Sequence, residues 1–267
     1  MNLALLRHTW RAYRIRLLVV TVGLSAWGSL MPIVYDSFGA QVREVFESGL
    51  LPAQFAEFGG GDLFSLGGSV AIGVIHPIAV SLNLVFALGF ATAAIAGERQ
   101  RGTLEILLSR PISRRRLYGT LALAALSFIG VAMAGLLAGV LGASALTGRL
   151  AELGIGNVPL LWLNGVLLYG AFGAVALGAS ASFDRLTPAI GIALAFVLVS
   201  YVFEVLGSLW PDARGLQPYS LFHYFDAKTV LAGLADTRDL AILGGVIAVA
   251  VGYALVVFPR RDLAAPS

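Results

Sequence analysis

Few ionisable side chains lie within the long apolar stretches of this sequence, and Glu204 is the most prominent of them. A carboxylate in such a position costs about 2.5–3.5 kcal/mol on insertion scales, so it could contact a cationic substrate or relay protons. It also lies shortly before Pro211, where it could simply reach water at a membrane surface. His76 and Asn83 are the remaining candidates for a substrate pathway. His76 precedes Pro77 and fits a structural role, and Asn83 could instead form a hydrogen bond between helices.

The motifs of the common catalytic and metal sites are missing from the sequence. There is no cysteine, and the three histidines lie in distant segments without an HxxxH pair. The only lysine, Lys228, follows Ala227 where a phosphate-binding loop needs glycine. No GxSxG elbow is present. We therefore expect a chain that is not itself an enzyme and binds no metal or cofactor.

Composition places the chain in a membrane. It has 267 residues, of which 58% are hydrophobic and 12% charged, whereas soluble domains carry about 25% charged residues. Apolar runs of the length that spans a bilayer recur, so we predict one all-α polytopic domain of six spans. The net charge of +3 does not indicate nucleic-acid binding, because the arginines flank the apolar runs. The predicted spans are 17–35, 69–96, 117–146, 158–181, 186–209 and 240–258.

Polar segments between the spans complete the plan. Residues 1–16 alternate arginines with apolar residues at helical spacing, which predicts an amphipathic helix lying in the membrane interface. Residues 36–68 fit either a second interfacial helix or an ordered loop, and residues 210–237 are too polar to span. Most of the 18 Lys and Arg residues fall on the side of the two termini and the 97–117 segment, which predicts that these parts are cytoplasmic.

The segment from 97 to 117, GERQRGTLEILLSRPISRRRL, is the longest hydrophilic run between two long apolar stretches and holds six arginines. Leu104, Leu107 and Leu108 share one face of a helix, which predicts a short amphipathic helix over 98–110. Pro111 should end that helix, and Ser113 can cap the next one. Such a helix suits docking on a partner protein. The alternative is a solvated loop whose arginines only set topology.

This segment resembles the cytoplasmic loop of the type-2 ATP-binding-cassette exporter permeases, which reads E-R-x-x-G-T-L-E-x-L-L-x-x-P-[VI]-S-R. The resemblance also takes in the six-span plan, the basic N-terminus and the aromatic QPYSLFHYFDA segment before the last span. The positions that match the loop pattern are Glu98, Arg99, Gly102, Thr103, Leu104, Glu105, Leu107, Leu108, Pro111, Ser113 and Arg114.

The resemblance implies a subunit of a larger machine. Two separate ATPase subunits, which carry the ATP and Mg²⁺, would dock on the loop helix, and the N-terminal interfacial helix would assist. A second permease, either another copy or a paralogue, would complete the complex in the bilayer. Short helices are expected near the outer surface between the last two spans. The implied docking residues are Glu98, Arg99, Gly102, Thr103, Leu104, Glu105, Leu107, Leu108, Arg110 and Pro111.

The expected function is therefore that of a permease-only subunit of an ATP-driven exporter in the plasma membrane. Its apolar spans suit a lipid, a drug or an antibiotic as substrate, as in multidrug efflux. Two alternatives remain open. One is a polytopic membrane enzyme or assembly factor with no ATPase partner, and the other is a proton-coupled carrier that uses Glu204.

Overall fold

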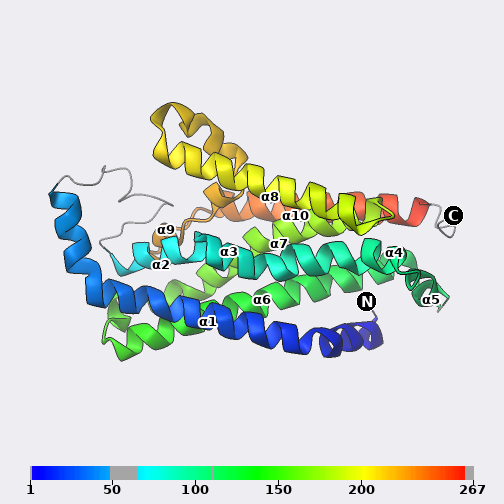
Figure 1. The fold of residues 1–267 in the computed structure, drawn as a ribbon, viewed down its shortest axis with the longest axis horizontal. Coiled ribbons are helices and arrows are strands. Elements are labelled where there is room, and N and C mark those ends of the chain that lie inside the picture. The colour runs from blue at the N-terminus through cyan, green and yellow to red at the C-terminus, as the bar shows by residue number, and fades with distance from the viewer. Residues whose placement is uncertain (1, 49–64, 110, 262–267) are drawn as a thin grey trace.

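We describe a computed structural model of the chain over residues 2–48, 65–109 and 111–261. All regular elements in these ranges are helices, most of which run side by side along one long axis (Figure 1). Among the described residues, five helices are long and apolar enough to cross a membrane, and there are six such candidates when a bent helix pair is counted as one span. The all-α polytopic fold is thus confirmed. The five long helices are α1 (Leu3–Glu47), α6 (Arg114–Leu146), α7 (Val158–Ser182), α8 (Leu186–Leu209) and α10 (Thr237–Arg260).

The first helix, α1, joins regions that we predicted as separate elements. The backbone is helical without a break from Leu3 to Glu47, so the helix expected at 1–16 and the first predicted span form one continuous helix. No glycine or proline stands near residue 16 to separate the two. The helix changes direction towards its C-terminal part (Figure 1), and Pro32 lies inside it, where a proline removes a backbone hydrogen bond. Part of the predicted 36–68 segment therefore extends α1, and its residues 49–64 lie outside the described ranges.

Direct backbone contact joins α1 to α6. A Cβ atom added at Gly139 would lie 1.9 Å from the backbone oxygen of Ser25, and one at Gly28 would lie 2.2 Å from that of Leu136. The hydroxyl of Ser29 donates to the carbonyl oxygen of Gly139 at 3.2 Å. Gly135 and Gly139 form a GxxxG pair on α6 and are thus part of the surface on which α1 lies.

The second predicted span, 69–96, is broken. It consists of α2 (Leu66–Ile75) and α3 (Pro77–Leu84), which meet at a bend of 48°. Proline at the first position of α3 cannot continue the preceding helix, and the side chain of His76 caps the new one. Two π-helical segments follow, η3 (Val85–Phe90) and η4 (Ala93–Gly97). Wider π turns leave backbone groups without their usual helical partners.

Short helices occupy the segments between the later spans. The 3₁₀ helices η5 (Leu150–Glu152) and η6 (Ile155–Asn157) link α6 to α7. Between α8 and α10 the chain forms η7 (Pro211–Tyr219), η8 (Phe222–Tyr224) and α9 (Ala227–Leu231), which agrees with the short helices expected there. These elements lie at the opposite end of the bundle from the two chain ends (Figure 1).

Candidate docking site at the end that carries the chain termini

The helix predicted over 98–110 is interrupted by a turn. The structure has α4 (Glu98–Gln100) and then, after a turn, α5 (Leu104–Leu108). Gly102 has a φ of 71°, a left-handed conformation that favours glycine and stops a helix. The hydroxyl of Thr103 donates to the backbone oxygen of Glu98 at 3.1 Å and also bonds to its carboxylate. Much of the sequence motif thus builds this turn.

The leucines of α5 do not form one outward-facing stripe. Leu104 is only 2% exposed and packs in the core of its own chain, so its side chain does not lie on the outward face of α5. The docking role expected for this segment stays a prediction. Leu107 and Leu108 are half-buried, and Leu108 also packs on the core. The turn at Gly102 rotates α5 so that Leu104 points back into the bundle. Its outward face instead carries Ile106, which is 65% exposed, with Glu105 and Ser109.

Arg99 and Asp184 fasten this segment to the turn between α7 and α8. Arg99 is 9% exposed, and its guanidinium nitrogen lies 2.8 Å from the Asp184 carboxylate. Arg261, at the end of α10, pairs with the same carboxylate and donates to the carbonyl oxygen of Ala181 at 3.0 Å. One acidic side chain thus holds two arginines from distant parts of the sequence, which places three chain segments in a fixed relation.

Further hydrogen bonds brace the same end. The side-chain oxygen of Gln100 accepts from the backbone N–H of Leu186, which begins α8, at 2.8 Å. Arg114 donates to the carbonyl oxygens of Pro259 and Arg261 at 3.2 and 2.6 Å. Ser113 caps α6, as predicted, by accepting from the N–H of Arg116. Pro111 is exposed, and Arg110 lies outside the described residues.

A hollow of about 300 Å³ opens between α4, α5 and the start of α6. Its walls combine the guanidinium groups of Arg99 and Arg114 with the side chains of Leu108 and Glu105. A hollow of this size has room for one side chain, and its lining combines apolar and cationic groups.

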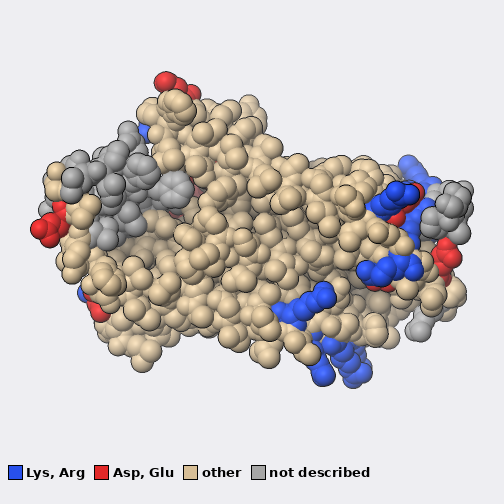
Figure 2. All heavy atoms as spheres, in the orientation of Figure 1, with Lys and Arg blue, Asp and Glu red and all other residues tan. Residues whose placement is uncertain are grey.

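The charges follow the arrangement that the sequence predicts. The two chain ends lie together with α4 and α5 at one end of the bundle (Figure 1). The Lys and Arg side chains visible in Figure 2 gather mainly towards this end, and a broad band beside them shows no charged side chain. That band has the character of a surface that faces lipid.

Family comparison agrees with this architecture. The family model described as ABC-2 family transporter protein matches residues 15–263, which is nearly the whole chain. The chain belongs to the ABC-2 family of transporter proteins. Comparisons with curated proteins and with solved structures gave no match. The family resemblance drawn from the 97–117 segment is thus confirmed.

Membership in the ABC-2 family gives the chain its general role. It is a multi-pass membrane permease of an ABC transporter, a type of subunit that pairs with an ABC ATPase and is not itself catalytic. In this ABC-2 permease the cluster around α4 and α5 combines a structural brace with an exposed apolar side chain.

The three candidate pathway residues do not meet in one site. The carboxylate of Glu204 accepts from the amide of Gln217 at 3.2 Å, in a polar hollow of about 280 Å³ that includes neither His76 nor Asn83. His76 accepts from the N–H of Ile78 at 3.3 Å, which is the structural role that the sequence suggested. The buried amide of Asn83 donates to a carbonyl oxygen of its own helix.

Sequence reasoning missed several residues that shape the docking end. Asp184, Gln100 and Arg261 carry the brace, and Ser180 bonds to the π-helical segment. Asp184 offered one usable signal, because it is an acid in a short turn on the arginine-rich side of the chain. The others needed knowledge of which distant segments meet.

Proposed function

We propose that this ABC-2 permease is the membrane subunit of an ATP-driven exporter in the plasma membrane, with its termini in the cytoplasm. Two ATPase subunits, each carrying ATP and Mg²⁺, dock on α4 and α5, and a second permease copy or paralogue completes the complex. The observation that carries this proposal is the exposed Ile106 on a short helix that Arg99 and Asp184 brace against the spans. The positive-inside distribution of the arginines supports the orientation.

The brace suits the transmission of force. ATP binding brings the ATPase subunits together. Their movement can be transmitted to the membrane spans only through a rigid contact. The described segment is continuous with the second span through α4 and η4, and Gln100 ties it to the beginning of α8. A displacement of α5 would therefore move two spans together. Helices that move as packed units are a common means of switching between open states.

The predicted docking residues take different tasks in this proposal. Glu98, Gly102 and Thr103 form the turn, and Leu104 anchors α5 to the core. Glu105 and Leu107 remain on or beside the outward face with Ile106. The partner would contact this face and place a side chain in the hollow beside it. Only the sequence pattern supports the inclusion of Arg110 and Pro111 in the proposed site.

We expect Ile106→Asp to weaken binding of the partner ATPase by about 30-fold, which corresponds to a hot-spot loss of about 2 kcal/mol. The new carboxylate would lose its hydration at the centre of the contact with the ATPase. Because Ile106 is exposed in the permease, the substitution should not destabilise the fold. The measurement is the affinity between the purified permease and its partner ABC ATPase, with ATP hydrolysis by the reconstituted complex as a second readout.

Arg115→Asp is the matched control, because Arg115 is exposed at the same end but lies on α6 outside the α5 face. It introduces the same side chain and should leave affinity within about threefold. If Ile106→Asp and Arg115→Asp bound the ATPase as tightly as the unchanged permease, the proposed docking face would be wrong.

The proposed substrate is a lipid, a drug or an amphiphilic antibiotic, because the spans offer mainly apolar surface. Substrate-stimulated ATP hydrolysis by the reconstituted complex tests this class. A set of amphiphiles should stimulate turnover, whereas small hydrophilic ions should not.

A variant of Glu204 distinguishes the exporter hypothesis from the hypothesis of a proton-coupled carrier. We expect Glu204→Gln to change ATP hydrolysis by the complex less than about twofold, since an amide can still accept the hydrogen bond from Gln217. The same variant is measured in vesicles that hold a proton gradient and no ATP. Gradient-driven substrate flux that Glu204→Gln abolishes would establish the carrier in place of the exporter.

A further inference from the structure

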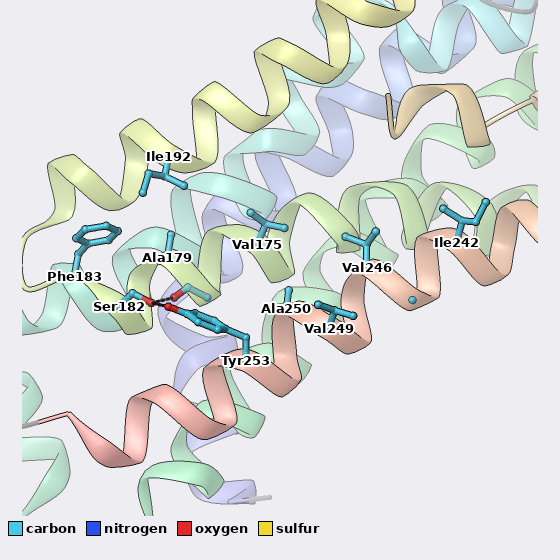
Figure 3. Close-up of a pocket in the computed structure, with 12 residues that line it drawn as sticks. Val175, Ala179, Ser182, Phe183, Ile192, Ile242, Val246, Val249, Ala250 and Tyr253 are labelled. Carbon is cyan, nitrogen blue, oxygen red and sulfur yellow. Dashed lines mark hydrogen bonds between the residues drawn. The ribbon is translucent and has the colours of Figure 1, made fainter. Parts of the chain in front are cut away.

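An apolar groove of about 740 Å³ lies between α7, α8 and α10 (Figure 3). Both α8 and α10 pack on α7, and they leave an open space between them. Ile192 of α8 and Val246 and Val249 of α10 line the groove, and Val175 of α7 forms part of its floor. A hydrocarbon surface of this kind holds an apolar ligand.

The polar atoms in the groove are already engaged with one another. The hydroxyl of Ser182 donates to the carbonyl oxygen of Gly178 at 2.8 Å. The Tyr253 hydroxyl lies 3.1 Å from the Ser182 oxygen, so it can donate to it (Figure 3). This pair connects α7 to α10 and leaves no hydroxyl proton for a ligand. The groove thus presents hydrocarbon to its occupant, and a polar occupant would lose its hydrogen bonds with water.

The length of the groove matches one leaflet of a bilayer. It extends along α10 from Ile242 to Tyr253, a rise of about 16 Å at about 1.5 Å per residue. Half of the hydrocarbon core of a bilayer is about 15 Å thick. An acyl chain that enters at the Tyr253 end would therefore lie in the groove along its full extent.

Two arginines stand beyond the Tyr253 end of the groove. Arg260 follows Tyr253 by two helical turns and so shares its face of α10, and Arg185 lies directly before α8. Both are exposed, and within the described part of the chain neither forms an ion pair. Long arginine side chains reach the headgroup level of a membrane, where they attract phosphate.

We propose that this groove binds an anionic phospholipid, with one acyl chain between α8 and α10 and the phosphate group at Arg185 and Arg260. The lipid comes from the leaflet that meets the arginine-rich end. It fills the space between α8 and α10. The first residue of α8, Leu186, is hydrogen-bonded to Gln100 of the docking segment. The proposal concerns a resident lipid and does not depend on what the permease transports.

Native mass spectrometry of the purified full chain in detergent tests the proposal with phosphatidylglycerol as the probe. We expect one tightly retained phosphatidylglycerol and no comparable retention of phosphatidylcholine. Arg185→Gln and Arg260→Gln should each weaken retention by roughly fivefold, whereas Arg115→Gln, an exposed arginine at the same end on α6, should not.

Two neighbouring glycines of α10 provide the control for the groove itself. Gly245 lines the groove and Gly244 does not, and at both positions an added Cβ meets no atom within 4 Å. Gly245→Leu should displace the lipid, while Gly244→Leu should retain it, with equal thermal unfolding temperatures for the two variants. Equal retention by both variants, or equal binding of phosphatidylcholine, would overturn the proposal. So would a loss of dimer on Gly245→Leu, because a second copy of the chain would then cover the groove.

Discussion

Gly139→Ala is expected to destabilise the permease by at least about 3 kcal/mol, at the upper end of the cost of overpacking. The new Cβ would lie 1.9 Å from the backbone oxygen of Ser25, so α1 and α6 would have to move apart along their contact. That movement would also break the hydrogen bond from Ser29 to the Gly139 carbonyl. Thermal unfolding in detergent should show a midpoint lowered by about 6–12 °C.

Gly142→Ala is the matched control on the same helix. Gly142 lies less than one turn away from Gly139, is exposed, and has no atom within 4 Å of an added Cβ. Its replacement should leave the midpoint unchanged or raise it slightly, since alanine is the better helix former by about 0.5–1 kcal/mol. Equal midpoints for Gly139→Ala and Gly142→Ala would contradict the close packing of α1 on α6.

The all-α polytopic class could be predicted because a membrane permits few kinds of spanning structure. Backbone groups in lipid must bond within their own segment or barrel, so a long apolar run becomes a helix. The short helices after α8 followed from a family resemblance rather than from periodicity. Pro77 could have indicated the break after His76. The apolar residues on both sides instead led to the prediction of one continuous span.

The direction of individual side chains in the docking segment could not be read from spacing alone. Leu104, Leu107 and Leu108 share a face in any helix, and the sequence pattern does not say whether that face meets a partner or the chain itself. The answer depends on the left-handed turn at Gly102, which orients α5 against the bundle. The partners of Arg99 were hidden for the same reason, because Asp184 lies far along the sequence.

The π-helical part of the second span connects the docking segment to α7 through one serine. Ser180 accepts from the backbone N–H groups of Ile95 and Ala96 at 3.2 and 2.9 Å and donates to the carbonyl oxygen of Thr92 at 2.6 Å. All of these groups are buried, so no water takes the place of the hydroxyl. A single side chain thus bonds to three backbone groups in a segment where π turns alter the usual helical hydrogen bonds.

Ser180→Ala should therefore cost about 2–4 kcal/mol, since it removes the hydroxyl oxygen that accepts from two buried N–H groups. Thermal unfolding in detergent measures the loss, and ATP hydrolysis by the reconstituted complex shows whether the joint between α7 and the docking segment also serves coupling. Ser182→Ala, on the same helix, removes a hydroxyl that is bonded to Gly178 and Tyr253 and should cost about 1 kcal/mol. The difference between the unfolding temperatures of the two variants gives the contribution of the π-helical contact beyond the general effect of losing a hydroxyl. If Ser180→Ala unfolded at the same temperature as Ser182→Ala, the segment would have to regain ordinary helical bonds without the serine, and Ser180 would not hold the docking segment to α7.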